Sequence, residues 1–200
     1  MLLALPAAGK AAGPVKILAL GDSLTAGYGL IQADAFVTQL QAAMRQAGDN
    51  VMVINGGVSG DTSAGGRSRL GWALADKPDA VIIELGANDG LRGLDPAETE
   101  RNLAAIINQA QTEGLAVLLT GMRAPPNLGG EYGAEFTALY RRLAGKAEIL
   151  FYPFFLEGVA ARPELNQADG IHPNAKGVAE IVRRILPMVR KLAASALNTL

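Results

Sequence analysis

The sequence predicts an α/β fold, in which helices cover both faces of a parallel β-sheet. Short apolar runs alternate with amphipathic stretches along most of the 200-residue chain. The apolar runs are continuous and rich in Val, Ile and Leu, which is typical of strands buried on both faces. No internal repeat and no long linker interrupts this alternation. A parallel sheet whose strands are joined by crossover helices accounts for all three observations.

Five apolar runs are the expected strands, at residues 15–20, 51–54, 80–85, 116–120 and 148–151. Five amphipathic stretches are the expected helices, at residues 35–47, 62–75, 96–113, 132–146 and 175–194. Helix-end signals support these ranges. Asp61 is a polar start for the second helix, and Asp95 and Asn174 are good N-cap residues for the third and fifth. Gly48 and Gly114 stand where the first and third helices should end.

Composition narrows the function classes. Half of the residues are apolar and 18% are charged, so the chain can bury a large core. The net charge is −1 and no basic stripe is present, which argues against nucleic acid as a partner. Cysteine is absent, which excludes disulfides, thiolate catalysis and Cys-ligated zinc. No apolar run reaches the ~18–20 residues that cross a bilayer, so we expect no stable membrane insertion.

The chain is expected to form one domain over residues 15–196, preceded by a flexible segment at residues 1–14. The first eight residues resemble the end of a signal peptide's apolar region, although a basic leader is missing. A frayed terminus and a signal-peptide remnant both fit this segment. The sequence leaves the choice between them open.

Polar residues gather where the predicted strands end. Ligands of parallel α/β sheets bind beyond the carboxyl ends of the strands. Gly21-Asp22-Ser23-Leu24 follows the first strand, residues 56–61 follow the second, and residues 86–89 follow the third. All three segments combine glycine with polar side chains, which predicts a functional site at this edge.

Ser23, His172 and Asp169 are the candidate catalytic residues. A serine hydroxyl is a weak nucleophile and needs a neighbouring base, for which imidazole is well suited. His172 is the only histidine of the chain, and Asp169 precedes it by three residues. On a helical turn this spacing places both side chains on one face, where the carboxylate would orient the imidazole.

Three groups are candidate donors to a developing oxyanion. The backbone N–H of Ser23 should start a turn into a helix, and Gly60 offers an N–H that no side chain obstructs. The side-chain amide of Asn88 offers a third donor from the next strand end. Together they would converge from successive strand ends.

Each of these residues also has a simpler interpretation. Ser23 alone could cap a helix, a single histidine is more often structural, and Asp61 and Asp169 fit turns or caps. Asp22 and Asp89 are expected to support or cap rather than react. A Mg²⁺ site, and with it a metal-dependent phosphoesterase, would instead use four aspartates: Asp22, Asp61, Asp89 and Asp169. The joint occurrence of a nucleophile, a base, an acid and donors favours the serine mechanism.

Other common motifs are absent. The chain has no G-x-S-x-G elbow, no G-x-x-x-x-G-K-[ST] loop and no G-x-G-x-x-G fingerprint. The usual α/β-hydrolase arrangement, a P-loop and a dinucleotide site are therefore unsupported.

At these residues the sequence resembles the SGNH, or GDSL, hydrolase family. Gly21-Asp22-Ser23-Leu24 resembles its first block, and Gly60 and Asn88 stand where the second and third blocks have their glycine and asparagine. Residues 169–174, Asp-Gly-Ile-His-Pro-Asn, resemble the fifth block. Within the family, the chain is similar to the bacterial thioesterase I/protease I/lysophospholipase L1 group, whose members are often called arylesterases.

The resemblance implies a flavodoxin-like three-layer α/β/α fold with a five-stranded parallel sheet. It implies a serine mechanism with no metal and no organic cofactor, acting on acyl esters such as lysophospholipids and aryl or alkyl esters, and on acyl-CoA thioesters. It also favours a periplasmic or secreted location. By the same resemblance, the loop after Asn88 lies over the acyl channel, which makes Leu91, Arg92 and Leu94 candidate substrate-binding residues.

Two other functions remain open on the same fold. A carbohydrate O-deacetylase shares the mechanism and differs in the shape of its pocket. A catalytically silent module would bind an acyl chain or lipid without cleaving it. For the oligomeric state, which the sequence leaves open, we favour a monomer.

Overall fold

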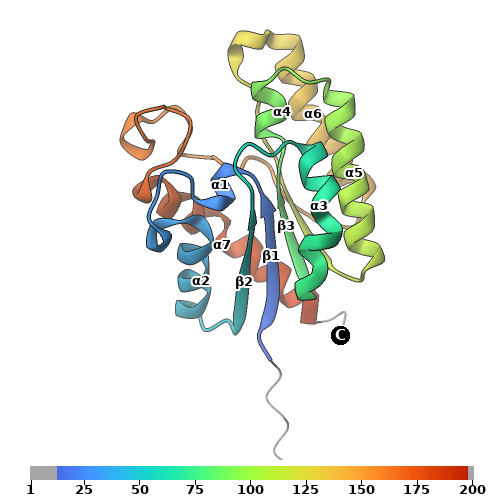
Figure 1. Ribbon diagram of the computed structural model, residues 1–200, viewed down its shortest axis with the longest axis vertical. Coiled ribbons are helices and arrows are strands. Elements are labelled where there is room, and N and C mark those ends of the chain that lie inside the picture. Colours follow the sequence, from blue (N-terminus) through green and yellow to red (C-terminus); the bar gives the residue numbers. More distant parts are fainter. Residues whose placement is uncertain (1–12, 198–200) are drawn as a thin grey trace, which may run out of the picture.

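The computed structural model describes residues 13–197. Five parallel strands form one sheet in the order β2-β1-β3-β4-β5 (Figure 1). The strands are β1 (Val15–Gly21), β2 (Val51–Gly57), β3 (Ala80–Glu84), β4 (Ala116–Thr120) and β5 (Leu150–Tyr152). The predicted strands are confirmed with small changes at their ends. The predicted flexible segment lies outside the described residues, apart from its last two positions.

Helices cover both faces of this sheet, which confirms the three-layer fold. The long helices are α2 (Phe36–Gln46), α3 (Ser63–Ala73), α5 (Pro96–Thr112), α6 (Gly130–Lys146) and α7 (Ala175–Leu197). Helices α2 and α7 pack together on one face, whereas α5 contacts α3 and α6 on the other (Figure 1). The turn into a helix expected at Ser23 is the short helix α1 (Ser23–Ala26). The sequence missed the short helix α4 (Ala87–Leu91) and short 3-10 turns at Gln32–Asp34, Leu74–Asp76, Pro126–Leu128 and Pro163–Leu165.

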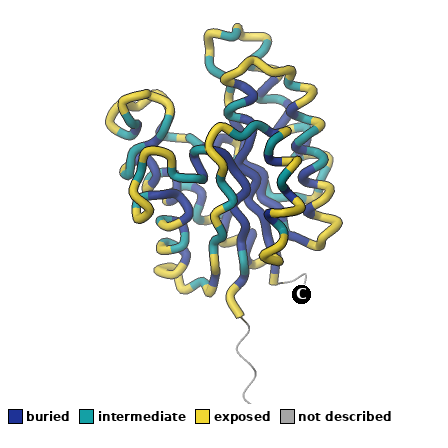
Figure 2. The backbone as a smooth tube through the Cα atoms, viewed as in Figure 1, coloured by how far each residue is buried: buried dark blue, intermediate teal, exposed yellow. Residues whose placement is uncertain are grey.

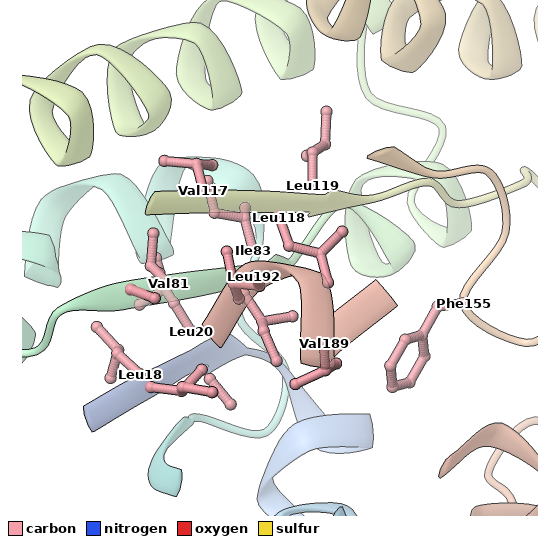
Figure 3. Packing of buried hydrophobic residues seen from close by; sticks show 14 of the residues in the cluster. Leu18, Leu20, Val81, Ile83, Val117, Leu118, Leu119, Phe155, Val189 and Leu192 are labelled. Atoms are coloured by element: carbon pink, nitrogen blue, oxygen red, sulfur yellow. The ribbon is translucent and has the colours of Figure 1, made fainter. Parts of the chain in front are cut away.

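The core lies between the central strands and the helices on either side. All five residues of β3 are buried, whereas β2 and β5, at the two edges of the sheet, are largely half-buried or exposed (Figure 2). The expectation of burial on both faces is therefore right for the central strands and wrong for these two, because an edge strand lacks a neighbour on one side. Val189 and Leu192 of α7 pack with apolar side chains of β1, β3 and β4 (Figure 3).

The helix-end predictions hold where they depend on local hydrogen bonds. Asp95 accepts from the N–H of Ala97 at 2.9 Å, and Asn174 accepts from the N–H groups of Lys176 and Gly177. Gly48 and Gly114 both have left-handed φ angles, of 85° and 79°. The start of α3 differs, because Thr62 rather than Asp61 is the N-cap. No helix in the described part of the chain is long and apolar enough to cross a membrane.

Candidate active site

Ser23 is the first residue of α1 and is separated from β1 by Asp22 alone. It lies at the carboxyl ends of the strands, where α4 also lies (Figure 1). Asp22 caps this helix by accepting from the N–H of Leu24 at 3.0 Å. The helix ends after one turn because Gly27 adopts a φ of 85° and returns its N–H to the carbonyl of Ser23. The short strand–turn–helix unit therefore presents the Ser23 hydroxyl at the end of the sheet.

His172 and Asp169 complete a continuous chain of hydrogen bonds with Ser23. His172 Nε2 lies 2.9 Å from Ser23 Oγ, across 149 residues of sequence. His172 Nδ1 lies 2.7 Å from Asp169 Oδ2. The two side chains meet as the three-residue spacing suggested, but on a turn and not on a helical turn, and Gly170 in this turn has a φ of 71°. Asp169 Oδ1 accepts from the N–H groups of Ile171 and His172, and these hydrogen bonds close the turn.

The charge on Asp169 fixes which imidazole nitrogen carries the hydrogen. Hydrogen bonds from the backbone and side chain of His172, together with the backbone of Ile171, lower the pKa of Asp169 to about 2. The carboxylate is therefore ionised near neutral pH and accepts the hydrogen on Nδ1. The other nitrogen, Nε2, is left to accept the proton of Ser23.

The loop that carries His172 is held against the loop after Ser23 by residues that were not among the predicted site residues. Gln167 donates from Nε2 to the carbonyl of Tyr28 at 2.8 Å, and its N–H donates to the carbonyl of His172 at 2.7 Å. The ring of Tyr28 lies 4.6 Å from the imidazole, centroid to centroid. Nothing in the local sequence pattern marks these residues, because their partners are distant in the chain.

Two of the predicted oxyanion donors are available. Within residues 13–197, neither the N–H of Ser23 nor that of Gly60 donates a hydrogen bond to another protein group. Gly60 adopts a φ of 85°, and Arg92 donates from Nη2 to its carbonyl oxygen at 2.8 Å. The peptide of Gly60 is therefore held in place while its N–H stays unused.

Asn88 reaches the same region, but its amide already has partners. Its Nδ2 donates to Asp22 Oδ2 at 3.1 Å and to the carbonyl of Asp61 at 2.9 Å. A primary amide has two N–H hydrogens, so both are in use in this structure. The structure brings Asn88 to residues 22–25, which carry the candidate nucleophile Ser23 and are called the nucleophile turn below. An oxyanion would have to share one of the two amide hydrogens.

Arg69 joins the last residue of β1 to the segment that follows β2. It donates from Nε to Asp61 Oδ2 at 2.5 Å and from Nη2 to the carbonyl of Gly21 at 2.9 Å. Asp89, which is nearly fully buried, instead accepts from the N–H and hydroxyl of Ser63 and from the hydroxyl of Thr99. Asp89 therefore anchors α4 to α3 and α5 and does not face the nucleophile.

The four aspartates considered for a metal site do not assemble into one. Asp22 accepts from Leu24 and Asn88, Asp61 pairs with Arg69, and Asp169 pairs with His172. Among the residues that the structure describes, no group of three or more His, Asp or Glu side chains has the arrangement of a metal centre.

A cavity of about 550 Å³ opens beside Ser23 and His172. Its wall is largely apolar and includes side chains that were not among the candidate substrate-binding residues: Leu24, Met122, Ala124, Phe154, Leu156 and Ile171. Of the three predicted substrate-binding residues, Leu91 lines this cavity and Arg92 and Leu94 do not. Arg92 holds Gly60, and the carbonyl of Leu94 accepts from the hydroxyl of Tyr132 at 2.7 Å.

Comparisons with known proteins show the family to which the chain is similar. Residues 19–179 match the family described as GDSL-like Lipase/Acylhydrolase. The chain is 41% identical over 191 residues to Esterase TesA of Pseudomonas aeruginosa, covering 95% of both proteins. It is 39% identical over 166 residues to Thioesterase 1/protease 1/lysophospholipase L1 of Escherichia coli, covering 82% of this chain and 78% of that protein. The crystal structure of AlinE4, an SGNH-hydrolase family esterase, superposes with a TM-score of 0.77 at 48% identity, over 91% of this chain and 98% of that one.

Proposed function

The chain belongs to the GDSL-like lipase/acylhydrolase family and is an ester hydrolase, and on this premise we propose that it acts through an acyl-enzyme intermediate on Ser23. One observation carries the proposal: the Ser23 hydroxyl, the His172 imidazole and the Asp169 carboxylate form one chain of hydrogen bonds beside an apolar cavity. His172 is the only histidine of the chain, and its two ring nitrogens pair with Ser23 and Asp169.

In the first step, Ser23 Oγ attacks the acyl carbonyl carbon while His172 Nε2 takes the hydroxyl proton. Asp169 stabilises the imidazolium that forms, because its carboxylate is 2.7 Å from Nδ1. The C–O bond to the leaving group then breaks, and His172 returns the proton to the departing alcohol.

In the second step, water attacks the acyl-enzyme and His172 again acts first as base and then as acid. The acid product leaves and Ser23 regains its proton, so the enzyme returns to its starting state.

The oxyanion is proposed to bind to the N–H groups of Ser23 and Gly60 and to share an amide hydrogen of Asn88. The two unused N–H groups support the first part. Well-placed donors of this kind are each worth about 3–4 kcal/mol of transition-state stabilisation. We expect one amide hydrogen of Asn88 to be shared between the oxyanion and one of its present acceptors, Asp22 Oδ2 or the carbonyl of Asp61.

The cavity supports an acyl chain as the group that is recognised. Its wall is mostly hydrocarbon. The aromatic ring in the wall, Phe154, is 9% exposed and lies under Arg123, whose Cζ is 4.3 Å from the ring centroid. The single Trp of the chain, Trp72, is 81% exposed and is not part of the wall. A sugar site would call for an aromatic platform, so a carbohydrate O-deacetylase is less well supported. We propose alkyl and aryl esters as substrates. The names of the relatives add acyl thioesters and lysophospholipids to the set to be tried.

The test compares wild type with Ser23→Ala on p-nitrophenyl esters of increasing acyl length, acyl-CoAs and lysophosphatidylcholine. We expect the variant to lose at least about 10³-fold in kcat on every substrate and to resist labelling by a fluorophosphonate. Full activity in Ser23→Ala would refute the mechanism. A wild-type protein that binds acyl chains but neither turns over nor becomes labelled would identify a silent binding module.

The periplasmic or secreted location and the monomeric state are also proposed here. Cell fractionation of the full-length protein and light scattering of the purified protein test them. Enzyme confined to the cytoplasm, or a mass of twice 20.7 kDa or more, would contradict them.

A further inference from the structure

A buried carboxyl group that the proposed mechanism does not use lies directly under the nucleophile turn. Glu84 is the last residue of β3 and pairs with Gly21, the last residue of β1. Its relative exposure is 0%, although glutamate is almost never fully buried without a partner. A glutamate at a strand end carries no sequence signal of this burial.

The Glu84 carboxyl holds the residues on either side of Ser23. Its Oε2 accepts from the N–H of Asp22 at 3.2 Å and from the hydroxyl of Thr25 at 2.7 Å. Asp22 and Thr25 are themselves fully buried. Both hydrogen bonds therefore form away from water, where losing either leaves a buried polar group unpaired.

The glycine at position 21 makes room for this arrangement. A Cβ on Gly21 would lie 2.5 Å from Glu84 Oε2 and 2.1 Å from Thr25 Oγ1. Neither distance is tolerable for a side chain. The Thr25 hydroxyl and the Glu84 carboxyl, which are hydrogen-bonded to each other, thus occupy the space that a side chain at position 21 would need.

Only one of the two Glu84 oxygens is engaged. Oε1 has no hydrogen-bond partner within the described residues, and the Asp22 carboxyl is buried nearby. Burial first, and then the charge of Asp22, raise the pKa of Glu84 well above its usual range. Asp22 receives hydrogen bonds from Leu24 and Asn88, so the negative charge of this pair belongs on Asp22. The raised pKa favours the neutral form of Glu84, and its Oε2 can accept both hydrogen bonds in either form.

We propose that Glu84 is a positioning residue for the nucleophile, and that its acceptor oxygen fixes the turn that holds Ser23 within reach of His172. The inference rests on the proposed function, because it takes Ser23 to be the nucleophile. It extends to Asn88, which is held by Asp22 on the same turn. A displacement of the turn would therefore disturb the nucleophile and a proposed oxyanion donor together.

The test separates three roles of the Glu84 side chain: its acceptor oxygen, its titratable group and the volume that it fills. Glu84→Gln keeps an acceptor oxygen without the titratable group, whereas Glu84→Met fills a similar volume with no acceptor. Thr120→Val is the matched control: Thr120 is fully buried on the neighbouring strand β4 and donates to the carbonyl of Ile83 at 3.1 Å, away from the turn. Each variant is measured for kcat, KM, the rate of fluorophosphonate labelling and the thermal midpoint.

We expect Glu84→Gln to keep kcat within about threefold of wild type, and Glu84→Met to lower kcat and the labelling rate ~10–100-fold with KM little changed. Thr120→Val should lower the thermal midpoint yet leave kcat within about twofold. Glu84→Met with the kcat and labelling rate of Thr120→Val would overturn the inference. An equal loss in Glu84→Gln and Glu84→Met would overturn the acceptor role as well.

Thr25→Val serves if Glu84→Met does not fold. It removes one donor to Oε2 at nearly constant volume, and we expect kcat and the labelling rate to fall about fivefold, again at unchanged KM. Values equal to those of Thr120→Val would reject the inference. Ser23→Ala is measured alongside: an active Ser23→Ala defeats the proposed function, whereas an inactive Ser23→Ala with a fully active Glu84→Met defeats only the role of Glu84.

Discussion

Asn88 donates an amide hydrogen to the Asp22 carboxylate at 3.1 Å, so a proposed oxyanion donor is held by the residue that precedes the nucleophile. The second hydrogen of the same amide goes to the carbonyl of Asp61. The segments after β1, β2 and β3 therefore meet at one side chain. This contact links the shape of the nucleophile turn to the position of the amide.

Asn88→Ala should lower kcat about 10²–10³-fold while KM changes little, because an oxyanion donor acts mainly on the transition state. Steady-state kinetics on a p-nitrophenyl ester measures both constants. Asn102→Ala is the control, since Asn102 also donates a side-chain hydrogen bond, to Ser63, but lies outside the cavity wall. Comparable kcat values in the two variants would exclude Asn88 from the oxyanion site.

Asp169→Asn should lower kcat ~10³–10⁴-fold, because a neutral amide neither stabilises the imidazolium nor enforces the hydrogen on Nδ1. It should also change the pH dependence of stability. The folded-state pKa of Asp169, about 2, is below its ordinary value of 3.8. A lowered carboxyl pKa contributes stability that is present above pH 4 and is lost as the pH falls toward 2.

The measurement for Asp169 is the free energy of unfolding of both proteins between pH 2 and pH 7. The advantage that wild type has over Asp169→Asn at pH 5 should shrink from about pH 4 downward. A difference that stays the same down to pH 2 would show that the ionised carboxylate contributes nothing specific to stability.

Arg69→Lys should lower the free energy of unfolding by about 1–3 kcal/mol, because lysine cannot span both Asp61 and the carbonyl of Gly21 as the guanidinium does. Arg67→Lys, on the same helix, changes only an exposed contact to Asn102 and should cost less than about 0.5 kcal/mol. Urea unfolding of both variants gives the comparison. Equal losses would mean that the bridge between the strand ends is not stabilising.

Leu91→Phe should narrow the apolar cavity and shift the preference toward shorter acyl chains. We expect kcat/KM on a long-chain p-nitrophenyl ester to fall about tenfold while the acetate ester is affected less than about threefold. Leu94→Phe, three residues on and outside the cavity wall, is the matched control. The same shift in Leu94→Phe would show that the loop, rather than the wall, sets the preference.

Much of the architecture could be predicted because it depends on local signals. Continuous apolar runs marked all five strands, and cap residues such as Asp95 and Asn174 marked helix starts. A turn into a helix was expected at Ser23, whereas α4 was missed because it is short and its Asp89 is held by Ser63 and Thr99 of other helices. The carboxylate of Asp22 caps α1, but it is Glu84, from another strand, that holds the turn.

By itself, the sequence determined the parallel α/β fold, the position of polar residues at the strand ends and the types of residue available for chemistry. Only the tertiary structure decided how those residues meet. It placed His172 2.9 Å from Ser23 across 149 residues, engaged both hydrogens of Asn88, and set Leu91 rather than Arg92 or Leu94 in the cavity wall. The physical reason is that apolar periodicity and caps act over a few residues, whereas buried hydrogen bonds such as those of Glu84 exist only once the strands are side by side.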